Sequence, residues 1–166
     1  MKKLIVFLFL ITLLFLNNDK QVVIPKESIR YRIIANNNST AYQQEKWDIN
    51  SQIIPYLIES ITNVSNIEQA RYNIKSSIPK ISEVVNKINT NSKINYGENY
   101  FPEKRFKNVV YNEGNYESLT ITLGSGMGDN FWCVLFPPLC LIEANNDNID
   151  EVNYKIYIKD IINKYF

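Results

Sequence analysis

The chain has 166 residues and carries 18 lysines and arginines against 17 aspartates and glutamates, so its formal net charge is +1. This balance argues against nucleic-acid binding, which needs a surplus of Lys and Arg gathered against phosphates. The chain contains no histidine, which removes His-activated serine or cysteine nucleophiles, His-ligated zinc and a histidine general base. We therefore expect neither a metal nor a cofactor.

The first 24 residues are predicted to be a signal peptide or a short membrane anchor. Lys2 and Lys3 precede an almost unbroken apolar run over residues 4–16, a pattern typical of a secretory signal. The run is short for a stable span, because a bilayer core takes about 20 apolar residues as a helix. No small-residue cleavage site follows, so cleavage and retention as a tether both stay open. Residues 28–166 are expected to form a single domain outside the cytoplasmic membrane.

Cys133 and Cys140 are the only two cysteines. In an exported chain two thiols at this spacing favour a disulfide. Zinc would need further ligands, and the chain offers no histidine and no other cysteine. A bridge would close a ring of about eight residues and stabilise the fold by roughly 2.5 kcal/mol before any strain. Two reduced, buried thiols that act as small apolar side chains are the alternative.

The first half of the domain is predicted to form one strand and two helices. The strand covers residues 29–35, whose side chains alternate between two faces. A helix follows over residues 41–61, with a kink or a short break expected at Pro55. Ser65 and Glu68 have the spacing of a capping box, which predicts the start of a second helix of similar length.

The second half is predicted to be mainly extended. A polar stretch at residues 112–115 resembles the turn of a hairpin. Residues 152–158 alternate with a period of two, which predicts a strand before a terminal helical turn. The other predicted strands cover residues 94–101, 107–111, 116–123 and 131–136. Together these elements predict an α+β fold, in which two helices cover one face of a mixed or mainly antiparallel sheet.

Residues 124–140 combine alternate glycines, an aromatic strand and a diproline. A phosphate-binding loop would need a helix directly after the glycines, whereas the residues that follow are strand-like and run into Pro137 and Pro138. We expect a tight turn and a stiff loop that together form one apolar, partly exposed patch, anchored from beneath by Trp132. A glycine turn that only closes the sheet is the alternative. The candidate partner-binding residues are Gly124, Gly126, Gly128, Trp132, Phe136, Pro137, Pro138 and Leu139.

Residues 131–140, Phe-Trp-Cys-Val-Leu-Phe-Pro-Pro-Leu-Cys, resemble the signature of the stage II sporulation protein R family. Three earlier segments match in the right order, so that the resemblance covers roughly residues 28–143. They are the strand Ile-Arg-Tyr-Arg-Ile-Ile-Ala-Asn at 29–36, Asn-Tyr-Gly with Phe-Pro-x-Lys between 95 and 104, and Gly-Asn-Tyr-Glu-Ser-Leu at 114–119. The family usually has a second tryptophan where this chain has Phe131, and Arg-Asp where it has Asn50 and Ser51.

The resemblance implies an exported signalling protein of endospore-forming bacteria that is not itself an enzyme. It would be made in the forespore and exported into the space between the forespore and mother-cell membranes. Its expected partner is a membrane-embedded aspartic peptidase, which it would activate to process the precursor of sigma factor E. The protein would be secreted or tethered, and it would contact the membrane only through an uncleaved leader.

An extracytoplasmic hydrolase that acts on the cell envelope is the second hypothesis. Glycosidase chemistry needs two carboxylates at a fixed separation, one of them with a raised pKa. The candidates for such a pair are Glu98, Glu103, Glu117 and Asp129. Two convergent carboxylates in a cleft would favour the hydrolase, and an exposed apolar patch at the diproline loop would favour the activator.

Overall fold

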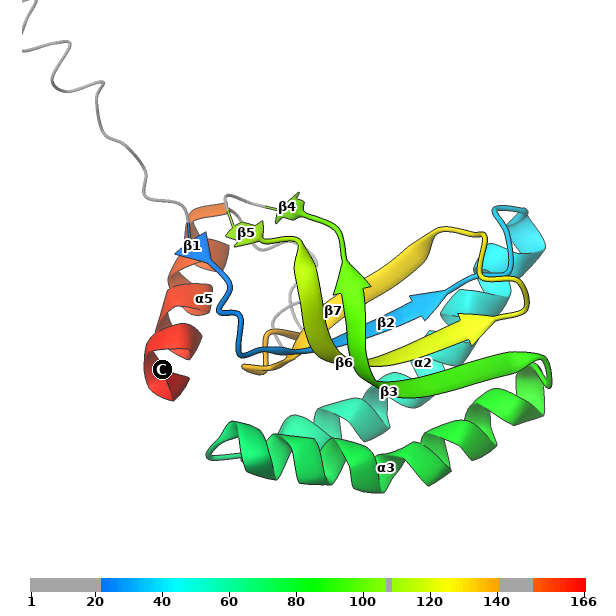
Figure 1. The fold of residues 1–166 in the computed structure, drawn as a ribbon, viewed down its shortest axis with the longest axis horizontal. Coiled ribbons are helices and arrows are strands. Elements are labelled where there is room, and N and C mark those ends of the chain that lie inside the picture. The colour runs from blue at the N-terminus through cyan, green and yellow to red at the C-terminus, as the bar shows by residue number, and fades with distance from the viewer. Residues whose placement is uncertain (1–21, 107–108, 141–150) are drawn as a thin grey trace, which may run out of the picture.

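The computed structural model describes residues 22–106, 109–140 and 151–166. These residues form an α+β fold with two sheets, as predicted (Figure 1). The predicted leader lies outside the described residues except for its last three, so it stays a prediction. None of the helices in the described ranges is both long enough and apolar enough to span a bilayer.

The main sheet has the strand order β3, β6, β2, β7. β2 (Ile29–Ile34) runs parallel to β6 (Gly114–Leu123) and antiparallel to β7 (Asn130–Phe136). β3 (Ser92–Phe101) pairs with β6 in the antiparallel sense. The sheet is therefore mixed and mainly antiparallel. Its one parallel pair needs a long crossover, and the two helices that follow β2 belong to this connection.

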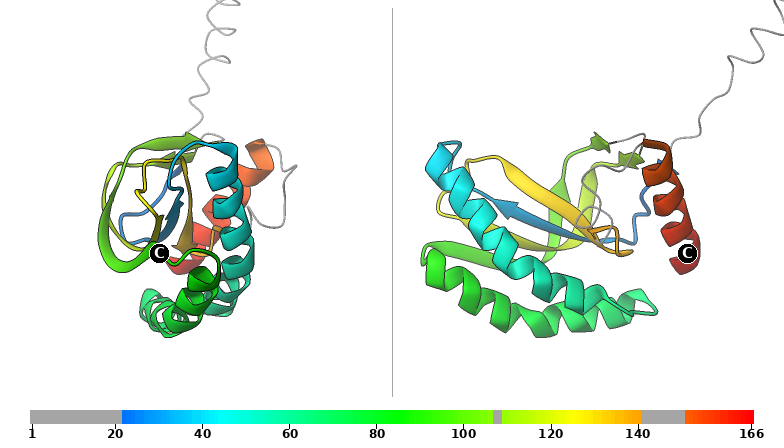
Figure 2. Two further views of the ribbon diagram at one scale, coloured as in Figure 1. Left: turned by 90° about the vertical axis from the view of Figure 1, so that its right-hand side faces the viewer. Right: turned by 180° about the vertical axis from the view of Figure 1, so that it is seen from behind.

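These helices, α2 (Thr40–Ile61) and α3 (Ile67–Ile88), cover one face of the main sheet (Figure 2). Of the kink or short break expected at Pro55, the break does not occur, because α2 continues without interruption through this residue. A proline removes one backbone donor, and the remaining hydrogen bonds of this 22-residue helix hold it together. The helix is also tied to the sheet, since the buried Tyr31 hydroxyl donates to Asn50 Oδ1 at 2.9 Å.

The predicted capping box lies one residue later than expected. Asn66, not Ser65, is the N-cap of α3, and its side chain accepts a hydrogen bond from the backbone N–H of Gln69 at 2.9 Å. The Gln69 side chain reaches back to the backbone N–H of Ser65 at 2.9 Å. The arrangement is similar to a capping box, with Asn66 and Gln69 in place of Ser65 and Glu68, but the Gln69 side chain bonds the residue before the N-cap.

The predicted hairpin turn at residues 112–115 is wrong. β4 (Lys104–Phe106) and β5 (Val109–Tyr111) pair with each other, and β5 also pairs with β1 (Val22–Val23) in a second sheet. Phe101 lies opposite Gly114 in the main sheet, and Lys104 lies opposite Tyr111 in the small sheet. Three residues therefore separate the two pairs in each of the antiparallel segments, β3–β4 and β5–β6. These two segments therefore form one long antiparallel ribbon, with β3–β4 as its first arm and β5–β6 as its second, which runs from the main sheet into the small one. Residues 112–115 lie within its second arm, and only residues 112 and 113 interrupt the pairing.

The C-terminal strand predicted over residues 152–158 is also wrong, because this segment belongs to the helix α5 (Glu151–Tyr165). An alternation over seven residues is too short to exclude a helix, and the residues beyond it continue an apolar stripe with helical spacing. The stripe packs against the buried clusters of the protein through Ile158, Ile161, Ile162 and Tyr165.

Candidate functional site

The structure joins Cys133 and Cys140 in a disulfide, with their Cα atoms 5.6 Å apart, which confirms the predicted pairing. The loop that it closes is buried, however, and does not form an exposed patch. Phe136 and Leu139 are 2% and 1% exposed, and both prolines between them are also buried. Phe136 packs against the Tyr165 ring at the end of α5, with ring centroids 5.0 Å apart. The apolar side chains of this loop therefore fill the protein interior.

The glycine turn over residues 124–128 lies at the other end of β7, so it does not form one patch with the diproline loop. It packs against the loop after β2. Asn36 accepts hydrogen bonds from the backbone N–H groups of Ser125 at 2.8 Å and Met127 at 3.0 Å. Gly124 has φ of 55°, and a Cβ atom there would collide with the Asn36 side chain. The turn is thus fixed by its neighbours and leaves Met127 80% exposed at its tip.

Cationic and aromatic side chains gather on the face of the main sheet opposite α2 and α3. Every segment that carries the resemblance to the sporulation family contributes at least one of them. We call this set the cation–aromatic cluster: Arg30, Arg32, Phe101, Lys104, Tyr116 and Trp132.

Arg30 is the centre of the cluster and is 0% exposed. Its guanidinium carbon lies 3.4 Å from the ring centroid of Tyr116, 5.2 Å from that of Phe101 and 5.3 Å from that of Trp132. Nη2 donates a long hydrogen bond of 3.4 Å to the Asn112 carbonyl, whereas Nε and Nη1 have no hydrogen-bond partner. Burial lowers the pKa of Arg30 to about 10, because removal from water disfavours the charged form.

Arg32 and Lys104 place two more cations beside the same rings. The Arg32 guanidinium carbon lies 4.7 Å from the Phe101 ring centroid, and the Lys104 Nζ atom lies 4.9 Å from that of Trp132. Burial lowers the pKa of Arg32 as well, and its Nε has no hydrogen-bond partner. Ring faces attract cations by about 0.5–2 kcal/mol each. Aromatic faces therefore offset part of the cost of burying these charges.

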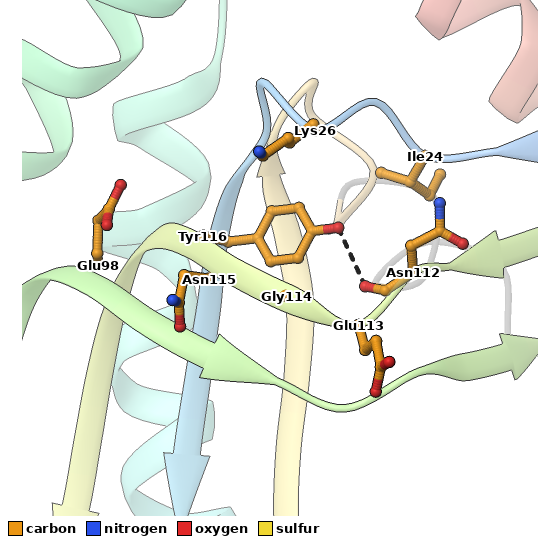
Figure 3. Close-up of a pocket in the computed structure, with 8 residues that line it drawn as sticks. All are labelled: Ile24, Lys26, Glu98, Asn112, Glu113, Gly114, Asn115 and Tyr116. Carbon is orange, nitrogen blue, oxygen red and sulfur yellow. Dashed lines mark hydrogen bonds between the residues drawn. The ribbon is translucent and has the colours of Figure 1, made fainter.

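A pocket of about 480 Å³ adjoins the cluster at Tyr116 (Figure 3). Tyr116 donates from its hydroxyl to the Asn112 carbonyl at 3.0 Å. Glu98 and Glu113 also line the pocket, but Figure 3 shows that they lie on different sides of it and point apart. The pocket therefore does not bring two carboxylates together as a glycosidase site would require.

The carboxylates proposed for a hydrolase do not form a catalytic pair. Glu117 is held by Arg71, with Nε–Oε1 and Nη2–Oε2 distances of 2.7 and 2.8 Å, and these hydrogen bonds lower its pKa. A general acid would need the opposite shift. Glu103 pairs with Arg105 at 2.9 Å on the surface, and Asp129 lies in the loop contacts at the glycine turn. No metal-binding group of His, Cys, Asp or Glu occurs in the described ranges.

Sequence reasoning missed the cation–aromatic cluster. The available signal was the alternation of Arg30 and Arg32 with apolar residues in β2, which places two cations side by side on one face of a buried strand. Phe101 and Tyr116 were singled out only as parts of matched motifs. Phe101 and Tyr116 come together because β3 pairs with β6 in this register. A hairpin turn at residues 112–115, as predicted from the sequence, does not give this pairing.

The fold and this cluster define a disulfide-bonded α+β protein with buried cations among aromatic rings on one face of its main sheet. The model of the family described as stage II sporulation protein R matches residues 25–146, and the chain belongs to this family, which supports a role in sporulation. The chain is 37% identical over 136 residues to Stage II sporulation protein R of Bacillus subtilis (strain 168). That match covers 78% of this chain and 61% of the relative, so the chain spans less than two thirds of the relative's length. No solved structure matches the chain significantly.

Proposed function

We propose that the protein is an exported sporulation signal that activates a membrane-embedded aspartic peptidase and is not itself an enzyme. The peptidase would then process the precursor of sigma factor E in the mother cell. The observation that carries this proposal is the family match over residues 25–146, which includes all four motif segments. The lack of convergence among the candidate carboxylates Glu98, Glu103, Glu117 and Asp129 supports the same view over the hydrolase.

The proposed location is the space between the forespore and mother-cell membranes. The basic and apolar leader over residues 2–16 supports export, and the disulfide between Cys133 and Cys140 suits an oxidising compartment outside the cytoplasm. The protein would be free or tethered there, according to whether the leader is cleaved. A tethered form would meet a membrane-embedded partner at the same surface.

Among the predicted partner-binding residues, those of the glycine turn are the ones that could contact the peptidase. Met127 projects from it, and the turn is fixed by hydrogen bonds from Ser125, Met127 and Gly128 to the 35–36 segment. A surface that is already held in one conformation loses little entropy on docking. The buried residues Phe136, Pro137, Pro138 and Leu139 would support the fold behind such a contact.

The proposal is tested by co-expressing the full chain with the candidate peptidase and the sigma-factor precursor, and by scoring precursor processing on immunoblots. Processing should require the full chain. Met127→Ser should reduce processing, whereas Tyr72→Ser, which removes a side chain that is 73% exposed on α3, should not. Processing that is equally efficient without the protein would overturn the proposal. Normal activity of Met127→Ser would move the contact away from the glycine turn.

A further inference from the structure

We propose that the cation–aromatic cluster is a binding site for a carboxylate group, with Arg32 and Lys104 at its rim and Arg30 behind them. The ligand would be an acidic side chain or a chain-terminal carboxylate of another polypeptide. The site differs from the glycine turn proposed above as a contact for the peptidase, and it lies on the other side of the sheet from α2 and α3.

The first argument is the concentration of unpartnered polar atoms. Among the described residues, six buried side-chain nitrogen or oxygen atoms have no hydrogen-bond partner, and four of them lie here. They are Arg30 Nε, Arg30 Nη1, Arg32 Nε and Thr120 Oγ1. Arg32 lies directly opposite Thr120 in the β2–β6 register, so these atoms share one sheet face. Buried polar atoms without partners are rare in folded proteins and therefore point to a missing partner.

The second argument concerns the chemistry of that partner. A guanidinium group can only donate hydrogen bonds, so the partner must be an acceptor. None of the ion pairs in the described ranges includes Arg30, Arg32 or Lys104, so the ligand should also be negative. A carboxylate meets both needs, because its two oxygens match the spacing of two guanidinium N–H groups.

The third argument is access and shape. Arg30 is fully buried, but Arg32 is only partly buried and Lys104 is exposed, which leaves a cationic rim at the surface. Phe101 lies within 5.2 Å of the Arg30 guanidinium and 4.7 Å of the Arg32 guanidinium. A carboxylate would approach from this rim, where Arg32 and Lys104 reach the surface, because the planar edge of a guanidinium group matches the two oxygens of a carboxylate.

The test uses the oxidised full chain with Trp47→Phe, so that Trp132 is the only tryptophan left to report binding by its fluorescence. N-acetyl-aspartate amide supplies a side-chain carboxylate, and N-acetyl-alanine supplies a chain-terminal one. Each is titrated at constant ionic strength against chloride, with inorganic phosphate as a further arm. At least one carboxylate should give a saturable change that chloride does not give, and the stronger of the two identifies the source.

Arg32→Gln should weaken the carboxylate affinity about tenfold, the loss expected for one charge-assisted hydrogen bond. The matched control is Arg105→Gln, which removes the same charge from a β4 residue paired with Glu103 and should leave the affinity unchanged. Lys104→Gln provides a second, exposed variant if Arg32→Gln folds poorly.

The proposal is overturned if the change does not saturate, if chloride reproduces it, or if Arg32→Gln and Lys104→Gln bind like the parent. Tighter binding of phosphate than of either carboxylate would overturn the assignment of the ligand class. The titration contains no peptidase, so its failure is distinguishable from failure of the proposed signalling function.

Discussion

The two faces of the main sheet are built from alternate residues of the same strands, and they differ in chemistry. The face under α2 and α3 is filled by aliphatic side chains such as Ile33 and Ile121, both fully buried. The opposite face holds Arg30, Arg32 and their aromatic neighbours, whose rings belong to a second buried cluster that also includes residues of the small sheet and α5. Aliphatic burial stabilises a fold directly, whereas burial of an unpaired charge costs free energy.

This difference suggests a division of roles, in which the aliphatic face stabilises the fold and the cationic face carries the proposed binding site. A face that only had to be covered would have no need for arginine, because apolar residues of similar volume are often as stable or more stable. The disulfide belongs to the aliphatic face under α2 and α3, because Cys133 packs with the aliphatic residues. Its neighbour Trp132 packs on the opposite face, beside the cations. One strand, β7, therefore supplies both a structural clamp and a wall of the candidate binding site.

The largest effect is expected on the aliphatic face. Ile33→Ala should lower the free energy of unfolding by about 2–5 kcal/mol, because it removes buried methyl groups and leaves a cavity in a packed core. Ile34→Ala is the matched control, since the adjacent side chain points to the other face and is only partly buried. Urea denaturation measures both. An equal loss for the two variants would show that the faces do not differ in their contribution to stability.

Loss of the disulfide should have the next largest effect. Replacing both Cys133 and Cys140 by alanine should lower the free energy of unfolding by about 2.5 kcal/mol, the chain-entropy value for a ring of about eight residues. The urea midpoint of this variant is compared with that of the parent in the presence and absence of reductant. A midpoint that reductant leaves unchanged in the parent would mean that the bridge does not stabilise the domain.

A smaller effect is expected where α3 meets the sheet on the aliphatic side. The Arg71 guanidinium, hydrogen-bonded to Glu117, holds the pKa of that carboxyl below its usual value. A lowered folded-state pKa adds stability above the unfolded pKa, and this stability is lost as the pH falls through the folded value. Glu117→Gln should therefore cost about 1 kcal/mol at pH 7 and flatten the loss of stability between about pH 5 and 3.

The control for this variant is Glu83→Gln, which removes an exposed partner of Lys80 and Lys87 on the same helix. It should change neither the stability at neutral pH nor the acid profile measurably, because solvent screens such pairs. An acid profile that is identical in the parent and in Glu117→Gln would contradict the role assigned to the Arg71 pair.

The sequence was sufficient to predict the elements whose pattern is local. The alternation in β2, the long apolar stripes of α2 and α3, and the compartment argument for Cys133 and Cys140 all depend on neighbouring residues or on spacing. The errors occurred where distant parts of the chain decide the outcome. The helical conformation of residues 152–158 depends on the packing of α5 from Ile158 onward, and residues 112–115 take their role from pairing between distant strands.

The candidate site shows the same limit. The sequence predicts Phe136 and Leu139 in a partly exposed patch, because a stiff apolar loop can serve either packing or binding, and sequence alone does not say which face is covered. The cation–aromatic cluster joins four segments spread over about a hundred residues of the chain. Its only local trace was the pair Arg30 and Arg32 in an otherwise apolar strand.

The smallest effect on stability is expected from the substitution that looks most drastic. Arg30→Met should change the free energy of unfolding by less than about 1 kcal/mol in either direction, because it removes a buried, unpaired charge and keeps an unbranched side chain against the rings. Arg30→Ala should be worse than Arg30→Met, since it also removes the packing of the aliphatic stem and leaves a cavity. Urea denaturation separates the two contributions. A loss for Arg30→Met as large as that for Ile33→Ala would mean that the guanidinium group holds the fold together through Tyr116 and the Asn112 carbonyl, and that the two faces are equally structural.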